Sequence, residues 1–226
     1  MPPELPLPST VIPRPKGLAD EAYDVIFAKL MALEIAPGAR VTVDALVKEL
    51  GVSHTPIREA LGRLEGEGLV VKAHLAGYRA APQISRRRFD ELYDLRLLLE
   101  PFAADHAASR MNAHALHELE DLAQRMQKPG RRKERLDYSA FARLDAEFHD
   151  RILALSGNEL IRDTLGRLHV HFHLFRLMFH ARVTEEALNE HEALLAAFRT
   201  GDAGGAGHAM HDHIAKSRQR LVLAFS

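Results

Sequence analysis

The sequence predicts a mainly α fold in two parts, an N-terminal winged helix-turn-helix domain followed by an all-α bundle of six helices. Three observations lead to this prediction. Apolar residues repeat with a helical period in three short segments before residue 67. Two β-like stretches follow at 69–72 and 77–80, and together they form a small hairpin. From residue 85 onward, six further helical segments follow one another without convincing strand alternation.

The first three helices are marked by their apolar stripes and by the residues that end them. The first begins at Leu18 and stops at Pro37-Gly38, and the second ends at Gly51. Thr55 is expected to cap the third helix, and Pro56 takes its first position, where the missing N–H is not needed. The stripes consist of Ala22, Val25, Ile26, Leu30 and Leu33 in the first helix, Val43, Leu46, Val47 and Leu50 in the second, and Ile57, Ala60, Leu61 and Leu64 in the third.

Short helices joined by a tight turn and followed by a hairpin are typical of a winged helix-turn-helix, which is a nucleic-acid-binding class. We assign residues 17–82 to it. Residues 1–16 hold six of the 11 prolines and are expected to form a disordered arm. Residues 83–88 are interpreted as a linker, and residues 89–226 as the all-α domain. Its expected helices span 85–110, 112–127, 134–156, 158–180, 184–200 and 203–224.

The composition excludes several classes of protein and of site. The chain has no Cys, so any metal ion has to be held by His and carboxylate groups. No window approaches the roughly 18 consecutive apolar residues of a membrane helix, and we expect a soluble, cytoplasmic protein. Residues 1–82 carry nine Lys+Arg against ten Asp+Glu, which predicts weak DNA binding by a single domain and favours a dimer on two half-sites.

A motif at the start of the third helix carries the DNA-binding hypothesis. Residues 52–61 read V-S-H-T-P-I-R-E-A-L, and a G-L turn at 68–69 leads into the hairpin. With this core, residues 18–82 resemble the GntR family of bacterial transcription regulators. The resemblance implies base contacts from Arg58 and from position 54, where His54 replaces the usual Arg, and phosphate contacts from Ser53 and Thr55.

The physical chemistry of the third helix agrees with this resemblance. A helix N-terminus offers free N–H groups and a positive dipole end to phosphate, and Arg58 lies near enough to that end to reach a guanine edge. Arg63 and Gly77 complete the predicted DNA-binding residues. The alternative is that Arg58 and Glu59 belong only to a solvated helix face.

Four side chains in the all-α region form a candidate metal site. Asp145 and His149 lie at i and i+4 on one helix face, and His191 and His213 fall on the last two helices. Three imidazoles and a carboxylate on facing helices suit Zn²⁺, Ni²⁺ or Mn²⁺. By spacing alone, these histidines could equally be surface groups or satisfied core groups.

The same residues carry a second resemblance. D-x-x-F-H at 145–149, E-H at 190–191 and H-I at 213–214 make residues 85–222 similar to the FCD ligand-binding domain of the FadR-like branch of GntR regulators. Six helices point to its VanR-type members. The resemblance implies that Asp145, His149, His191 and His213 bind a divalent ion, with Zn²⁺ as the first candidate and Ni²⁺ or Mn²⁺ as alternatives. It also places an effector-binding arginine at Arg96.

The predicted effector-binding residues are Arg96, Asn158, His169 and His173. A guanidinium inside a bundle needs an anion, so Arg96 and the metal are expected to hold the two ends of a small organic acid. The alternative for Arg96 is a permanent salt bridge to Glu100 at i+4. His169 and His173 share a helical face with His180 and either line the pocket or pack in the ordinary way. Asn158 also fits a helix cap.

Together these features predict a homodimeric transcription regulator that is not an enzyme. It would bind double-stranded DNA at a palindromic operator, and a small carboxylate effector in the helical domain would shift its operator affinity. One alternative is a regulator for which the metal ion is itself the signal. A metal-dependent hydrolase is a further alternative, but the sequence contains no H-E-x-x-H or comparable general-base arrangement.

Overall fold

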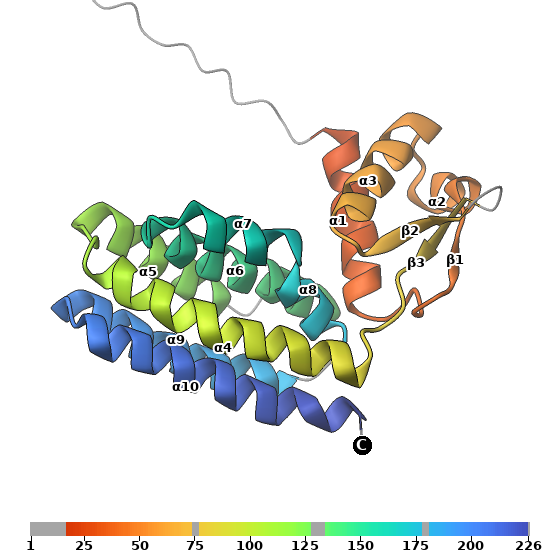
Figure 1. Cartoon of the computed structure of the whole chain (residues 1–226). Coiled ribbons are helices and arrows are strands. Elements are labelled where there is room, and N and C mark those ends of the chain that lie inside the picture. Colours follow the sequence, from red (N-terminus) through yellow and green to blue (C-terminus); the bar gives the residue numbers. More distant parts are fainter. Residues whose placement is uncertain (1–16, 74–76, 128–133, 178–180, 226) are drawn as a thin grey trace, which may run out of the picture.

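The computed structural model describes residues 17–73, 77–127, 134–177 and 181–225. A small domain of three helices and a three-stranded sheet lies beside a larger bundle of helices (Figure 1). The proline-rich arm expected at 1–16 and His180 lie outside the described residues. None of the helices among the described residues is long and apolar enough to cross a membrane.

The small domain is the winged helix-turn-helix that the sequence predicts. Its elements are α1 (Leu18–Met31), β1 (Arg40–Val41), α2 (Val43–Leu50), α3 (His54–Gly66), β2 (Val70–Ala73) and β3 (Gly77–Ala80). Strand β3 pairs antiparallel with both other strands, so that Val41 lies opposite Tyr78 and Val70 lies opposite Ala80. Ile57, Ala60, Leu61 and Leu64, the predicted stripe of α3, are fully buried in the core of this domain.

Three local details differ from the sequence-based expectation. Helix α1 ends at Met31, before Pro37, and Leu33 beyond it has a left-handed φ of 56°. Helix α3 begins at His54 with Ser53 as its N-cap, so that Thr55 lies inside the first turn instead of capping it. Pro56 fits that turn because the first N–H groups of a helix have no intrahelical partner. The short strand β1 has only two residues and therefore shows no alternation that the sequence could reveal.

The bundle has seven α-helices within the described residues, where the sequence predicts six. They are α4 (Arg86–Ala108), α5 (Ala113–Gln127), α6 (Glu134–Leu155), α7 (Glu159–Arg167), α8 (Val170–Phe175), α9 (Ala181–Thr200) and α10 (Ala203–Leu221), followed by a 3₁₀-helix at Val222–Phe225. The segment 158–180 forms two helices because His169 adopts a left-handed backbone with a φ of 43°. Such a residue cannot continue a right-handed helix.

Helix α6 lies in the middle of the bundle. It packs against α4, α5, α7, α8 and α9, and it also contacts α1 of the small domain. Helices α4 and α10 run side by side, and α9 packs against α10 (Figure 1). Helix α4 begins at Arg86, inside the predicted linker 83–88, because the Ser85 hydroxyl accepts a hydrogen bond from the Arg88 N–H and caps the helix there.

Helices α6 and α8 carry the contact between the two domains. The ring of Phe172 in α8 meets Phe27 of α1 edge-on, with the centroids 5.1 Å apart. Arg143 of α6 pairs with Asp24 at 2.6 Å, and its guanidinium lies 4.1 Å from the centre of the Phe27 ring. One hydrophobic cluster runs through these residues from one domain into the other. The two domains therefore share packed side chains.

A reciprocal pair of hydrogen bonds ties the end of α8 to the segment between the domains. Arg176 Nη2 donates to the Ala81 carbonyl at 2.6 Å, and Gln83 Nε2 donates to the Arg176 carbonyl at 2.8 Å. Arg176 is 1% exposed, and burial lowers its pKa. Nearby, Gly68 has a φ of +69°, and a methyl group there would come within 3.4 Å of His173 Nε2. Helix α8 thus contacts both the linker and the turn before β2.

His173 should make the stability of the protein depend on pH. Burial, and then the charge of Arg176, lower its pKa from 6.5 to about 4. The unfolded chain therefore binds more protons between these two values, and this contribution to stability is lost as the pH falls from 6.5 towards 4. Between pH 7 and pH 5, the free energy of unfolding measured in urea should fall by about 2 kcal/mol less in His173→Gln than in the wild type. Equal losses in the two proteins would contradict this assignment.

Candidate metal centre and nucleic-acid interface

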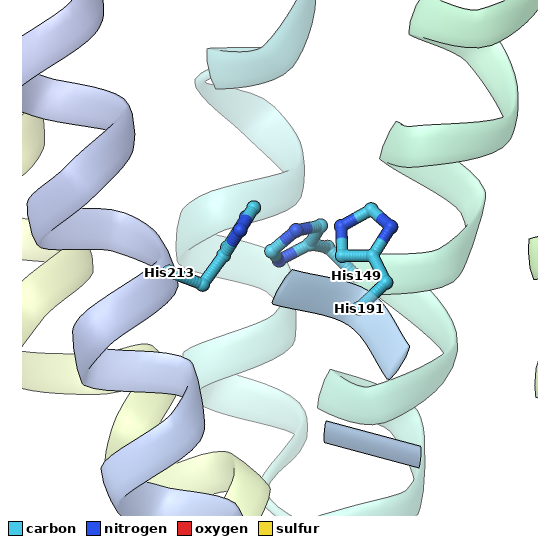
Figure 2. Close-up of side chains that lie close together, drawn as sticks. All are labelled: His149, His191 and His213. Atoms are coloured by element: carbon cyan, nitrogen blue, oxygen red, sulfur yellow. The ribbon is translucent and has the colours of Figure 1, made fainter. Parts of the chain in front are cut away.

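Three buried histidines from three helices face one another inside the bundle (Figure 2). They are His149 of α6, His191 of α9 and His213 of α10, and each is at most 4% exposed. One ring nitrogen of each histidine lies within 4.8 Å of the corresponding nitrogens of the other two. The turn at Gly201, with a φ of +67°, joins α9 to α10 and brings the last two histidines together.

Asp145 completes the set predicted from the sequence. It lies one turn before His149 on α6, is 4% exposed, and its Oδ1 lies 3.3 Å from His191 Nε2. The structure thus brings Asp145, His149, His191 and His213 together, from three separate parts of the chain. Phe148 holds the ring of His191 in place by stacking on it, with the centroids 4.5 Å apart.

The polar atoms of this cluster fit a bound cation. Asp145 Oδ1, His149 Nε2 and both ring nitrogens of His191 are buried, and they have no hydrogen-bond partner among the residues that the structure describes. Buried polar atoms are nearly always satisfied, and unpaired ones are costly. Three imidazoles and one carboxylate are a common ligand set for Zn²⁺ and related divalent ions. These four side chains could therefore hold such an ion.

The surroundings favour neutral imidazoles and ionised carboxylates at neutral pH. Burial lowers the pKa of His213 to about 3, and it lowers the pKa of His171 well below its usual value. Burial alone would raise the pKa of Asp145, but the contact with His191 and the neighbouring imidazoles lower it below its usual range. Neutral imidazole and ionised carboxylate are the states in which these groups bind metal ions.

Two arginine–glutamate pairs flank the cluster. Arg96 Nε donates to Glu100 Oε1 at 2.5 Å, and both side chains are 2% exposed. Burial would raise the pKa of Glu100, but the charge of Arg96 and the contact with His149 hold it well below its usual range. Arg96 therefore forms the salt bridge considered as its alternative role. On the other side, Arg220 donates to both oxygens of Glu190 at 2.6 and 2.9 Å.

His171 lies at the site although the sequence analysis did not select it. Its Nε2 is 3.3 Å from Arg96 Nη2 and 3.9 Å from Asp145 Oδ2, and its ring centroid lies 4.5 Å from that of His149. The sequence analysis grouped His169 with His173 on one continuous helix. The left-handed backbone at His169 ends that helix, and His171 of α8 is the histidine of this stretch that contacts Arg96.

The other predicted effector-binding residues lie farther from the four-residue cluster. Asn158 caps α7, where its side chain accepts a hydrogen bond from the Ile161 N–H, and it lines none of the described cavities. His173 contacts the turn at Gly68 of the small domain. His169 lines a cavity beside the cluster.

Two cavities adjoin the cluster and are separated by His171. The smaller one has a volume of about 20 Å³, and Arg96, Asp145, His213 and Arg220 are among its lining residues. The larger one has a volume of about 180 Å³ and a mainly apolar lining between α6, α7 and α8. Glu100 and His171 form the wall of the larger cavity towards the cluster, and His171 also lines the smaller cavity.

The start of α3 presents a polar surface to solvent. Ser53, His54, Thr55 and Arg58 are exposed there, and Arg58 has no ion-pair partner within the described residues. His54 Nε2 contacts Asp44 Oδ1 of α2 at 3.0 Å. Gly77, at the first position of β3, is exposed with a φ of +80°. This surface has the form of a recognition helix followed by a wing.

Arg63 is the predicted DNA-binding residue that the structure places elsewhere. Its Nη1 donates to Asp20 Oδ1 at 2.6 Å, and its guanidinium lies 4.1 Å from the centre of the Tyr23 ring. Both partners belong to α1. Arg63 therefore ties α3 to α1, one and a half turns beyond Arg58 along the helix.

Comparison with known proteins gives two family matches. Residues 18–79 match the family described as bacterial regulatory proteins, gntR family, and residues 91–216 match the family described as FCD domain. The second match alone spans more than half of the chain.

Individual proteins are similar over half of the chain or more. The Nta operon transcriptional regulator of Aminobacter aminovorans is 34% identical over 129 residues, which are 57% of this chain and 59% of that protein. The HTH-type transcriptional regulator McbR of Escherichia coli is 28% identical over 181 residues, or 78% of this chain and 80% of that one. The solved structure of E. coli McbR/YncC has the same fold, with a TM-score of 0.68 at 22% identity over 94% of this chain and 100% of that chain.

Binding of a divalent ion to the cluster should stabilise the folded protein. An ion that binds only the folded state adds about 4 kcal/mol at a thousand times its Kd. We expect Zn²⁺ to raise the Tm of chelator-treated protein and His191→Ala to abolish the rise. The matched control is His208→Ala, which changes a histidine that is 78% exposed on α10. Scanning fluorimetry checks this, and equal rises in the two variants would place the ion elsewhere.

Proposed function

The chain belongs to the GntR family of bacterial regulatory proteins and carries an FCD domain, and we propose that a small organic acid bound beside a divalent metal ion changes its affinity for operator DNA. The family and the matched relatives are transcription regulators, so the chain is a DNA-binding regulator of transcription and not an enzyme. The observation that carries the proposal is the cluster of four buried side chains with unpartnered ligand atoms.

For DNA recognition we propose the exposed start of α3. Ser53 and Thr55 at its N-terminus would contact phosphate, and Arg58 and His54 would contact base edges, with Gly77 allowing a close approach of the wing. His54 is shorter than the arginine usual in the family, so its base contact would differ from that of such relatives. Arg63 holds α3 against α1 through its contacts with Asp20 and Tyr23.

We expect a homodimer on a palindromic operator, because a dimer places two recognition helices on two half-sites of the DNA. An apolar surface on α4 and α7 supports it. Leu98 is 73% exposed, Phe102 is 47% exposed on the same face of α4, and Leu160 of α7 is 77% exposed. Helices α4 and α7 pack together beneath these side chains. Exposed apolar surfaces of this kind are typical of protein interfaces.

We propose that the acid group of an anionic effector enters the smaller cavity, which Arg96 and Arg220 line together with His213. It would share these guanidinium groups with Glu100 and Glu190, to which they are already paired. At about 20 Å³ this cavity has room for little more than one water molecule. An acid of several atoms would therefore enter only if His171 moved towards the larger, apolar cavity. An acid with a carboxylate at one end and an apolar body would fit the two cavities joined in this way.

Helix α8 supplies a route from the acid to the DNA-binding domain. His171 lies at the cluster, whereas Phe172, His173 and Arg176 contact α1, the turn before β2 and the linker. A ligand that binds better when His171 is displaced would select a different position of α8, and with it a different spacing of the two recognition helices.

The bundle has seven helices within the described residues, so a count of six helices does not support assignment to the VanR-type members. A regulator for which the ion alone is the signal stays an alternative, because the candidate ligands lie at the same place for both mechanisms.

Operator binding is tested first by fluorescence anisotropy on the intergenic DNA upstream of the gene that encodes this protein. The salt concentration is set at ~150 mM because phosphate contacts are salt-sensitive. Arg58→Ala should weaken binding roughly 10-fold, because a base contact by arginine contributes about 1–3 kcal/mol. Arg63→Ala is the matched control and should bind nearly as the wild type does, because its guanidinium is engaged with α1. Unchanged binding by Arg58→Ala would rule out its proposed contact.

The role of the acid is tested with the same assay on metal-free protein. Zn²⁺ alone, a panel of small mono- and dicarboxylic acids alone, and both together are added in turn. We expect an acid to change the operator affinity at least several-fold, and only in the presence of the metal. A change with Zn²⁺ alone and none with any acid would make the ion the signal. No change under any condition would contradict effector control at this site.

A further inference from the structure

We propose that Glu100 and Glu190 are positioning residues that fix His149 and His213 as the tautomers whose Nε2 faces the metal ion. The role of the ion itself rests on the proposed function above. The motifs assign no metal-positioning role to Glu100 or to Glu190, although Glu190 belongs to the E-H motif at 190–191. The inference also gives Arg96 and Arg220 a role through these glutamates.

The first of these contacts joins α4 to α6. His149 Nδ1 lies 2.6 Å from Glu100 Oε2, while Glu100 Oε1 accepts from Arg96 Nε at 2.5 Å. An ionised carboxylate only accepts and a guanidinium only donates, so the proton between His149 and Glu100 belongs to Nδ1. A neutral imidazole protonated at Nδ1 keeps its lone pair on Nε2. This Nε2 is the buried His149 atom that has no partner among the described residues.

The second contact repeats the arrangement on different helices. His213 Nδ1 of α10 lies 2.8 Å from Glu190 Oε2 of α9, and Arg220 holds both oxygens of Glu190. Because both carboxylate oxygens accept hydrogen bonds from the Arg220 guanidinium, Glu190 is the acceptor in its contact with His213, and the proton again lies on Nδ1.

The third histidine is held differently. Neither nitrogen of His191 has a hydrogen-bond partner among the described residues, and its ring is oriented by stacking on Phe148 at 4.5 Å. Two ligands are thus oriented in advance by arginine–glutamate pairs, and one is oriented by packing. Carboxylates that orient metal-binding histidines raise the basicity of the ring and the affinity of the site.

A direct test of the tautomers needs no metal. In ¹⁵N–¹H long-range NMR spectra of the metal-free, full-length protein, the imidazoles of His149 and His213 should carry their proton on Nδ1. Spectra of His149→Gln and His213→Gln identify the two signals. A proton on Nε2 of either ring, or a fast-exchanging mixture, would overturn the inference for that histidine. This readout stays decisive even if the protein binds no metal ion, which would instead contradict the proposed function.

A second test measures how tightly the protein binds Co²⁺ and Zn²⁺ in competition with a chelator. Glu190→Gln should weaken binding roughly 10- to 100-fold and shift the visible Co²⁺ spectrum. Glu186→Gln is the matched control on the same helix. Glu186 is 55% exposed and lies 3.4 Å from Arg220 Nε, so the metal affinity of Glu186→Gln should equal that of the wild type. Equal affinity in Glu190→Gln would overturn the positioning role.

Glu100 is fully buried, so its variant needs a companion change. Glu100→Gln alone would leave the guanidinium of Arg96 without its anion, which destabilises the core. The double variant Arg96→Met with Glu100→Gln removes both charges together. Where circular dichroism shows that it is folded, its metal affinity should fall as in Glu190→Gln. Wild-type affinity in the folded double variant would overturn the role of Glu100, and if the variant does not fold, the NMR measurement decides.

Discussion

The structure depends on how charged and polar side chains are compensated in the middle of the helical bundle. Glu100 and Glu190 each have an arginine beside them, whereas Asp145 faces imidazoles. Removing an ion from water costs several kcal/mol unless a partner is present. The negative charge that stays uncompensated lies where three imidazole rings converge from α6, α9 and α10 (Figure 2). A divalent cation bound there, as we propose, would supply the missing charge and the missing partners at once, and it would link the packing of these helices to the metal site.

Helix α8 connects this centre to the rest of the molecule. It is short, it begins at a residue with a left-handed backbone, and it lies at the end of the bundle nearest the small domain (Figure 1). One of its histidines is next to the cluster, and the residues that follow contact α1 and the linker. Its contacts on both sides make α8 the element through which we propose that an effector at the cluster acts on the small domain.

The sequence predicted the features that depend on local pattern. The stripe of α3, the bounds of α2 and β3, and the i, i+4 placement of Asp145 and His149 all follow from periodicity and capping. The features that it could not predict depend on tertiary contacts. The break at His169 comes from a left-handed backbone conformation that is uncommon outside glycine, and the helical period of the sequence does not indicate it. Glu190 meets His213 across two helices, a contact that no spacing within one helix indicates. Arg63 pairs with Asp20 of α1, a contact between residues far apart in the chain that the pattern of α3 does not indicate.

The central claim, that the buried cluster holds a divalent ion, is tested most directly by anomalous X-ray diffraction at the zinc edge on crystals grown with Zn²⁺. The account predicts one strong anomalous peak per chain, about 2.0–2.2 Å from Nε2 of His149 and His213, from a nitrogen of His191 and from an oxygen of Asp145. A cluster without a peak, or peaks only at exposed histidines such as His208 and His211, would contradict it.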